Sequence, residues 1–568
     1  MAQPAPAQSL ILMTVPQPES PAWWKEAVFY QVYPRSFADS NGDGIGDLPG
    51  ITGKLDYLKR LGVDGLWLSP IYASPNDDNG YDISDYLAIG PEYGTLKDFQ
   101  ELSLGLKERG LRLILDQVLN HTSDEHEWFH QSRSSRANPR RDWYHWLDAR
   151  TDGEGDRPVP PNNWRSVFGG SAWEWEASTQ QYYLHCFSRK QPDLNWRNPD
   201  VRRALYEVLT TWATRGADGF RLDVINMIAK AEGYPDVPRP AGNTEPFLNL
   251  DEYGVNQPPI HEYLREMHDA VFAGRDLYSV GETWWVGAHN TIDFTGYHRR
   301  ELNAAFYFYF HECASGQAHF ENFSNLYEAT RGKSWLTVTL GNHDSRRSLS
   351  RFGDPVNYRH ASASLLATWL LTLPATPFLF QGEELGLTDH AYSTITDYRD
   401  IQTVNRYQEL VASGVSPEKA LAEVRVTSRD NGRSPIPWDA TPGAGFSRGV
   451  PWLPIAGDHR PFHAAGQVDD PGSIFHAYAR LLALRKQVKS LVYGDFTPIK
   501  ESGQVLAYRR GEWGSHPAVC VILNWGSSAQ PWPCPIPSAD GILYANHGGI
   551  AYSHLRPWEA VIFTAARL

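Results

Sequence analysis

The sequence predicts an α/β protein: a (β/α)8 TIM barrel with a subdomain inserted after strand 3 and a C-terminal antiparallel β-sandwich. Three observations support this fold. Short apolar segments alternate with helical patterns over roughly 450 residues, which indicates parallel β/α units. One stretch after the third apolar segment lacks a helical period. The end of the chain consists of short strand patterns separated by turns.

Eight apolar segments are the expected barrel strands. They are residues 27–32, 65–68, 111–115, 219–222, 277–280, 303–310, 336–340 and 376–380. One helix is expected over residues 51–61, where apolar side chains recur every three or four positions. These side chains are Ile51, Leu55, Leu58 and Leu61. Eight units favour a closed barrel, although an open parallel sheet would have the same pattern.

Changes in composition suggest the domain boundaries. Residues 120–194 are rich in Trp, Tyr, Asn, Pro and Arg and are expected to form the inserted subdomain. The barrel would comprise residues 22–119 and 195–487. The patterns VLAYRR, PAVCVILNW and EAVIFTAARL predict an all-β domain over residues 488–568. Residues 1–21 are expected to be a disordered tail.

Composition argues against two classes of partner. The chain has 52 basic and 66 acidic residues, and its net charge of -14 would repel the phosphates of nucleic acids. No apolar run reaches the roughly 18 residues needed to cross a bilayer. Leu10 begins a short apolar run without the basic flank of a secretory signal. Because the four cysteines match no metal motif, we expect a reduced, cytoplasmic protein.

Four acidic residues stand at or just after the ends of predicted strands: Asp116, Asp223, Glu282 and Asp344. Any one of them could instead cap the helix that follows. In a parallel barrel, however, the carboxyl ends of the strands meet at one face, where reactive groups lie. We therefore expect the four acids to meet there.

Several carboxylates without a metal motif or a Ser–His pair indicate hydrolysis of a glycosidic bond. One acid protonates the leaving oxygen, and another attacks the sugar or activates water. In GFRLDVIN, Arg221 and Asp223 share one face of the strand, so Arg221 favours the ionised form of Asp223. Glu282 has aromatic neighbours and no basic one, which favours its protonated form. Asp223 is the expected nucleophile and Glu282 the expected proton donor.

GFRLDVIN, VGETW and GNHD, in this order, resemble three segments of the α-amylase superfamily, glycoside hydrolase family 13, and DQVLNH resembles a fourth. AVFYQVYPRSFADSNGDGIGDLPGI and SPNDDNGYDISDY resemble its oligo-1,6-glucosidase and α-glucosidase branch. The resemblance implies a retaining, two-step mechanism. Asp223 would form a covalent glucosyl-enzyme, Glu282 would act as acid and then as base, and Asp344 would stabilise the strained sugar.

The resemblance also implies a site that grips one terminal glucose. Asp82 and Arg429 would pair around its far hydroxyl groups and close the pocket. Cleavage would then be exo, from the non-reducing end. The other positions implied to bind substrate are Tyr81, His121, Phe168, Arg221, Val224, Trp284 and His343.

The segment DSNGDGIGD has oxygen-bearing side chains at alternate positions, like the start of an EF-hand loop. The twelfth position, Gly50, lacks the usual glutamate, so a complete EF-hand is not expected, and a metal-free turn is the alternative. The resemblance implies a structural Ca²⁺ or Mg²⁺ and no organic cofactor. Its ligands would be Asp39, Asn41, Asp43, the backbone carbonyl of Ile45, and Asp47.

Val224 follows the expected nucleophile directly. In the branch that the chain resembles, valine there accompanies a preference for α-1,6 bonds, and Trp284 agrees with this. We therefore expect an oligo-1,6-glucosidase that acts on short isomalto-oligosaccharides. Hydrolysis of α-1,4 bonds, cleavage of sucrose and transfer to another sugar stay open, because GETWWV, GNHDSRR and SPIPWD depart from the common pattern on the expected acceptor side.

A non-catalytic barrel that serves only for binding is the remaining alternative. Such relatives need a membrane anchor and usually lack the catalytic acids, whereas this sequence has the acids. The expected partner is a small oligosaccharide, with neither nucleic acid nor membrane. The chain is expected to be a monomer or a homodimer.

Overall fold

The computed structural model describes residues 20–150, 158–288, 290–308, 313–458 and 460–565. All but the last two residues of the expected N-terminal tail lie outside these ranges, as do residues 309 and 310 of the sixth expected strand. In the described ranges, no helix combines the length and the apolar character needed to cross a membrane.

Eight parallel strands form the central sheet, in the order β13-β12-β10-β5-β2-β1-β15-β14. Their bounds are β1 (Phe29–Val32), β2 (Gly65–Leu68), β5 (Arg112–Val118), β10 (Gly219–Asp223), β12 (Tyr278–Thr283), β13 (Ala304–Tyr307), β14 (Thr337–Thr339) and β15 (Thr376–Phe380). No ladder joins β13 to β14 among the described residues, but the Thr337 hydroxyl donates to the Ala305 carbonyl at 2.6 Å across this seam. The predicted barrel is therefore confirmed, in a nearly closed form.

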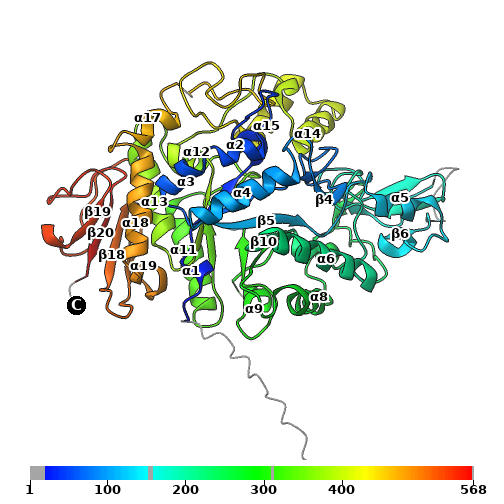
Figure 1. The fold of residues 1–568 in the computed structure, drawn as a ribbon, viewed down its shortest axis with the longest axis horizontal. Coiled ribbons are helices and arrows are strands. Elements are labelled where there is room, and N and C mark those ends of the chain that lie inside the picture. Colours follow the sequence, from blue (N-terminus) through cyan, green and yellow to red (C-terminus); the bar gives the residue numbers. More distant parts are fainter. Residues whose placement is uncertain (1–19, 151–157, 289, 309–312, 459, 566–568) are drawn as a thin grey trace, which may run out of the picture.

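Helices cover the outside of the barrel (Figure 1). They include α3 (Leu55–Leu61), α4 (Leu96–Glu108), α6 (Pro199–Arg215), α8 (Ile260–Met267), α11 (Gly316–Thr330), α13 (Arg359–Thr372) and α18 (Ile474–Gln487). The expected helix over 51–61 is instead two helices, because α2 (Leu48–Thr52) starts at the Asp47 cap and ends at Gly53. The apolar stripe is nevertheless buried as expected, with each of its side chains at most 1% exposed.

Side chains alternate between the two faces of the barrel wall. On β10, Phe220 and Leu222 pack into the large core outside the barrel, and Arg221 and Asp223 point inward. The amino-terminal half of the barrel interior is filled by aromatic rings such as Trp67. The polar groups are left at the carboxyl end of the barrel.

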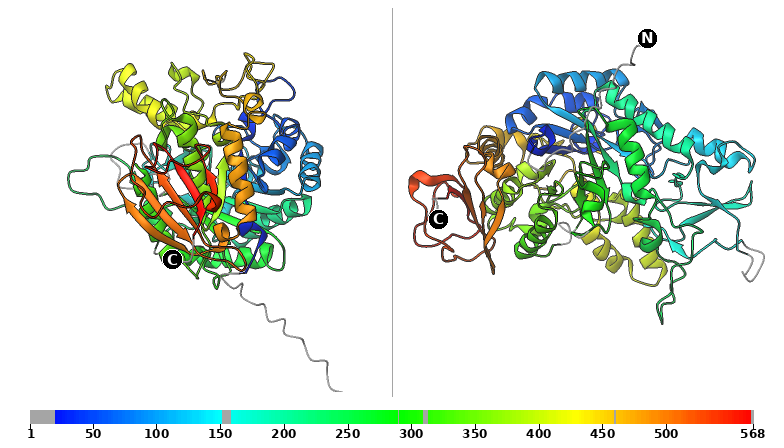
Figure 2. Two further views of the ribbon diagram at one scale, coloured as in Figure 1. Left: turned by 90° about the vertical axis from the view of Figure 1, so that its left-hand side faces the viewer. Right: turned by 90° about the horizontal axis from the view of Figure 1, so that it is seen from below.

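Two additions lie at opposite ends of the molecule (Figures 1 and 2). In the inserted segment, α5 (Glu127–Ser134) accompanies the antiparallel strands β6 (Trp146–Leu147), β9 (Gln181–Leu184) and β8 (Trp173–Glu176). In the expected C-terminal domain, the described residues form one five-stranded antiparallel sheet. Its strands are β16 (Phe496–Ser502), β17 (Val505–Arg510), β18 (Val519–Asn524), β20 (Ala560–Thr564) and β19 (Ile542–Ala545).

The remaining helices and short strands complete the fold. They are α1 (Trp23–Glu26), β3 (Tyr72–Ala73), β4 (Asp85–Ile89), β7 (Trp164–Arg165), β11 (Leu248–Asn249), α7 (Asp251–Gly254), α9 (Thr291–Thr295), α12 (Ser348–Phe352), α14 (Ile401–Ala412), α15 (Pro417–Thr427), α16 (Asp430–Arg433), α17 (Ala464–Val468) and α19 (Ser490–Tyr493).

Candidate active site

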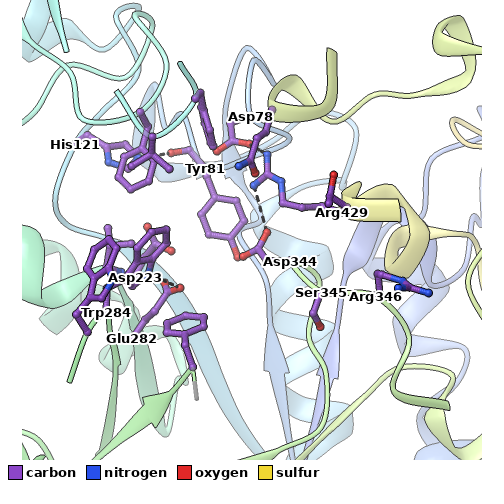
Figure 3. Close-up of a pocket in the computed structure, with 18 of the residues that line it drawn as sticks. Asp78, Tyr81, His121, Asp223, Glu282, Trp284, Asp344, Ser345, Arg346 and Arg429 are labelled. Atoms are coloured by element: carbon purple, nitrogen blue, oxygen red, sulfur yellow. Dashed lines mark hydrogen bonds and ion pairs between the residues drawn. The ribbon is translucent and has the colours of Figure 1, made fainter. Parts of the chain in front are cut away.

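A cavity of about 710 Å³ opens at the carboxyl ends of the barrel strands, where residues of the inserted segment meet α14 and α15 (Figure 3). Most of the predicted site residues line it: Tyr81, His121, Phe168, Asp223, Val224, Glu282, Trp284, Asp344 and Arg429. Arg221 and His343 are buried directly behind this lining, and Asp82 lies outside it. The acids at 223, 282 and 344 thus meet at one place.

Arg221 holds three carboxyl groups with one guanidinium. Its Nη1 donates to Asp116 at 2.8 Å and to Asp223 at 2.6 Å, and its Nη2 donates to Glu282 at 2.5 Å. The local sequence has a basic residue beside Asp223 and none beside Glu282, but in the fold the same Arg221 guanidinium contacts both acids. The residues are far apart in sequence, but β5, β10 and β12 are adjacent strands.

Asp223 and Glu282 are close enough to interact directly as well. Burial raises the pKa of Asp223 well above its ordinary value; Arg221 opposes this shift, while the charges of Glu282 and Asp116 add to it. Two buried carboxyl groups in contact resist ionising together, so the charge of Glu282 adds to the effect of burial on Asp223. One ionised and one protonated carboxyl group are what a nucleophile and an acid require.

The backbone after Asp223 fixes the position of Glu282. Val224 adopts a left-handed conformation (φ 36°, ψ 41°), which is strained for a β-branched residue. Its N–H donates to Glu282 Oε2 at 3.1 Å, and the Trp284 indole donates to Oε1 at 3.2 Å. The side chain of Val224 is buried against the cavity.

Asp344 faces this pair across the cavity (Figure 3). Its Oδ1 accepts hydrogen bonds from Arg433 at 2.8 Å and from Arg429 at 3.2 Å, and its Oδ2 lies 3.2 Å from His343 Nε2. Burial disfavours its charge, but these three neighbours still hold the pKa of Asp344 well below its ordinary value. Asp344 is therefore a fixed negative charge, suited to stabilising a cationic sugar.

Tyr81 and His343 connect the two sides of the cavity floor. The Tyr81 hydroxyl donates to Asp116 Oδ2 at 3.0 Å and lies 2.6 Å from His343 Nε2. Burial lowers the pKa of His343 to about 3, so its imidazole is neutral at pH 7. The two rings stack with centroids 5.2 Å apart, which fixes their orientation.

The expected pairing of Asp82 with Arg429 is wrong, because Asp78 is the partner. Arg429 Nη2 lies 2.9 Å from Asp78 Oδ1, and Asp78 lines the cavity. Asp82 is fully buried and accepts backbone N–H bonds from Asp77 and Asp78 at 2.8 and 3.0 Å. Burial raises its pKa to about 7. Asp82 shapes the loop that presents Asp78 and does not reach the cavity.

His121 and Phe168 line the cavity as predicted. His121 Nε2 lies 3.1 Å from the Tyr81 carbonyl, and burial lowers the pKa of His121 to about 4. The Phe168 ring lies 5.1 Å from the Arg429 guanidinium carbon, within the range of a cation–π interaction. An aromatic face and a neutral donor–acceptor group thus border the Asp78–Arg429 pair.

Further lining residues were missed by the sequence analysis. They are Asp78, Val167, Phe187, Trp285, Val286, Phe308, Ser345, Arg346, Arg351, Gln402, Val426 and Thr427. The departures in GETWWV and GNHDSRR were a usable signal, since they contain Trp285, Ser345 and Arg346. Gln402 and Thr427 carry no motif, because they reach the cavity from α14 and α15.

The aspartate loop lies away from this cavity. Asp39 accepts the N–H groups of Gly42 and Gly44, Asp43 accepts that of Ile45, and the loop closes tightly. Gly44 has φ +93°, and a Cβ there would lie 1.9 Å from the Val450 carbonyl oxygen. In the described part of the chain, no three His, Cys, Asp or Glu side chains gather in an arrangement that could hold a metal ion.

Fold and site define the class of this protein. Residues 31–494 match the model of the α-amylase catalytic domain, so the chain belongs to the α-amylase family, glycoside hydrolase family 13. It is a glycoside hydrolase of the α-glucosidase type. The chain is 43% identical to the oligo-1,6-glucosidase of Parageobacillus thermoglucosidasius over 562 residues, which cover 95% of this chain and 98% of that protein.

Solved structures agree with this family. A trehalulose synthase variant bound to Tris is 40% identical, with a TM-score of 0.90 over 96% of this chain and 100% of that chain. An isomaltulose synthase variant from Erwinia rhapontici NX5, bound to sucrose, is 39% identical, with a TM-score of 0.89 over 96% of this chain and 99% of that chain.

Proposed function

We propose that this chain is a retaining, exo-acting α-glucosidase that removes terminal α-1,6-linked glucose from short isomalto-oligosaccharides. The observation that supports this best is the Arg221 guanidinium, which holds Asp223 and Glu282 together at the cavity floor. A two-step retaining reaction needs its two carboxyl groups only about 5 Å apart, closer than a single-displacement reaction allows.

The reaction follows from these positions. Asp223 attacks the anomeric carbon as a carboxylate. At the same time Glu282 donates its carboxyl proton to the glycosidic oxygen, and the leaving sugar departs. Glu282, now ionised, takes a proton from water, and the resulting hydroxide attacks the same carbon and releases Asp223. Asp344 faces the sugar from the other side and stabilises the positive charge of each transition state.

Exo cleavage is supported by an ion pair in the lining of the cavity. The Asp78–Arg429 pair and Phe168 stand beyond Asp344, where a longer chain would have to continue. Such a pair can hold the far hydroxyl groups of one terminal sugar through charge-assisted hydrogen bonds. We therefore assign the pair to recognition of the non-reducing end.

The preference for α-1,6 bonds is supported by Val224 and by the related oligo-1,6-glucosidases. The test is a comparison of kcat/KM on isomaltose, maltose, sucrose and trehalose, with all products resolved. We expect the highest value for isomaltose and glucose as the main product. A higher value for maltose would overturn the linkage, and an absence of glucose release from all four would overturn the function.

A sucrose-acting or transglucosylating enzyme is the second candidate. The isomaltulose synthase variant bound to sucrose supports it, as does the aromatic wall of Trp284, Trp285 and Phe308 on the outer part of the cavity. Such a wall can hold an acceptor sugar in place of water. The same product analysis distinguishes this candidate from hydrolysis. For a sucrose-acting or transglucosylating enzyme, isomerised sucrose or new trisaccharides would exceed free glucose among the products.

We also propose that the aspartate loop binds a structural Ca²⁺ or Mg²⁺. The support is donor chemistry: Asp39, Asn41, Asp43, the Ile45 carbonyl and Asp47 offer only oxygen atoms. Binding requires the carboxylates to turn from their backbone N–H partners to the ion. Chelation should lower the melting temperature by several degrees while the initial rate at low temperature stays the same; an unchanged melting curve would contradict the site.

We also propose that the protein is cytoplasmic and that its cysteines are reduced. The support is that Cys186, Cys520 and Cys534 form no disulfide in the described part of the chain. The proposal of a monomer or homodimer is tested by light scattering on the purified chain.

A further inference from the structure

The cavity has an inner and an outer part of different charge. Its described acidic lining residues, Asp78, Asp223, Glu282 and Asp344, all belong to the inner part and contact Arg221 or Arg429. The outer part contains Trp285, Val286, Phe308, Ser345, Arg346, Arg351, Gln402, Val426 and Thr427. Among these described residues there are two arginines and no acid.

Arg346 lies on the Asp344 side of the cavity, near the reaction centre, and Arg351 lines the same cavity from α12. Ser345 and Arg346 directly follow Asp344, so the Cα of Arg346 is within about 7 Å of that of Asp344. Figure 3 shows both residues opposite Asp223, Glu282 and Trp284. A sugar that leaves the inner part, or enters as acceptor, would lie between these two sides.

Arg346 forms an ion pair, whereas Arg351 forms none with a described residue, although the charge of Asp389 partly opposes the effect of burial on it. Arg346 Nε lies 2.6 Å from Asp389 Oδ2, and Asp389 is outside the cavity lining. Arg351, on α12, forms no ion pair with a described residue, and its buried Nη1 atom meets no hydrogen-bond acceptor there. Burial, with Arg346 beside it, lowers the pKa of Arg351.

An unpaired, partly buried guanidinium is costly to maintain in a cavity that receives only neutral groups. It becomes favourable when the ligand supplies the missing anion, because a charge-assisted hydrogen bond to a phosphate or carboxylate is stronger than one to a hydroxyl group. Arginine also matches the planar, two-oxygen face of such anions.

We propose that Arg351, assisted by Arg346 and the Ser345 hydroxyl, forms an anion subsite for a phosphate or carboxylate carried by the leaving sugar or the acceptor. This inference rests on the proposed function, since it places the anion on the sugar next to the terminal glucose. The inner part stays selective for an unmodified glucose, and the outer part favours a charged neighbour.

The test compares three substrates that share the terminal glucose. They are isomaltose, isomaltobionate, in which the reducing glucose is a gluconate, and isomaltose phosphorylated on its reducing glucose. We expect kcat/KM of the wild-type chain to be at least about tenfold higher for one or both anionic substrates. The carboxylate and phosphate arms distinguish the two sources of charge.

Arg351→Gln should remove this advantage, so that kcat/KM falls more on the anionic substrates than on isomaltose. Arg351→Lys keeps the positive charge and should retain part of the advantage of the anionic substrates over isomaltose. Arg300→Gln, which removes an exposed arginine that is not a cavity-lining residue, is the matched control. A wild-type preference for isomaltose over both anionic substrates overturns the subsite. Equal losses on all three substrates in Arg351→Gln also overturn it, because they indicate a structural role.

The two proposals fail separately. If isomaltose is not cleaved but an anionic substrate is, the proposed activity on uncharged isomalto-oligosaccharides fails and the subsite stands. If isomaltose is cleaved and the anionic substrates are slower, the glucosidase proposal stands and the subsite fails.

Discussion

At the scale of single residues, the reaction depends on how one guanidinium is shared. Arg221 contacts Asp116, Asp223 and Glu282 together, so the position of one guanidinium fixes three carboxyl groups. A proton must reside on Glu282 when the substrate is bound, because the leaving oxygen needs it. Either acid without the other leaves the first step incomplete.

Asp223→Asn should abolish hydrolysis, with kcat lower by at least about 10³-fold, because an amide cannot form the glycosyl ester. The melting temperature should not fall, since burial raises the pKa of Asp223 and makes its charge unfavourable in the fold. Single-turnover assays and thermal melts check both statements. Substantial remaining turnover would show that another group is the nucleophile.

Val224→Thr should raise the ratio of maltose to isomaltose activity, by about tenfold if the side chain sets the linkage. The substitution keeps the β-branched shape and adds one hydroxyl group to the cavity wall. The matched control is Val411→Thr on α14, at a side chain that is 37% exposed. If both variants keep the wild-type ratio, Val224 does not determine the linkage.

At the scale of elements, loops decide which of several similar side chains reaches the cavity. The segment SPNDDNGYD contains three aspartates, and sequence pattern alone does not rank them. Left-handed backbone at Asn76, Asn79 and Gly80 turns the loop so that Asp78 faces Arg429. Asp82 then stays inside the turn as an acceptor of backbone N–H groups.

Asp78→Asn should lower kcat/KM by about 10- to 100-fold, the loss of one charge-assisted contact, without lowering the melting temperature. Asp82→Asn should instead lower the melting temperature, because one of its two acceptor oxygens becomes a donor that faces backbone N–H groups. Steady-state kinetics and melts on both variants separate the two roles. The reverse result would restore the pairing of Asp82 with Arg429.

The barrel strands were easier to predict from the sequence than the loops. A buried strand needs a continuous apolar segment, so β2 and β15 begin and end where the sequence indicates. The strand-end acids follow from the barrel rule. Arg351 and Gln402 could not be predicted, because their place depends on how α12 and α14 pack around the cavity mouth. The helix break at Gly53 was hidden by an apolar stripe that continues across it.

At the scale of the whole molecule, buried histidines affect the response to acid. Burial lowers the pKa of His145 to about 3, while in the unfolded chain it is about 6.5. Between these values only the unfolded state binds the proton, so stability falls as pH falls, by about 1.4 kcal/mol per pH unit. Asp82 and Glu383 act in the opposite direction, because burial raises their pKa values to about 7 and about 8.

His145→Gln isolates one such contribution. The variant loses a 2.7 Å contact with the Tyr234 hydroxyl and should be less stable at pH 7. The difference in melting temperature from the wild type should narrow on going to pH 5, where the wild type has lost about 2 kcal/mol through this histidine. A gap that stays constant or widens would show that His145 is not held neutral in the fold.

The seam between β13 and β14 is the least hydrogen-bonded part of the described barrel wall, and it lies next to the reaction centre. Without a ladder there in the described chain, the amide groups along β14 should exchange with deuterium sooner than those of β10, which has neighbours on both sides. Asp223 and Glu282 lie on the β13 side of the seam, and Asp344 lies on the β14 side. A glucose bound to all three acids would therefore connect the two sides of the seam and slow deuterium exchange along β14.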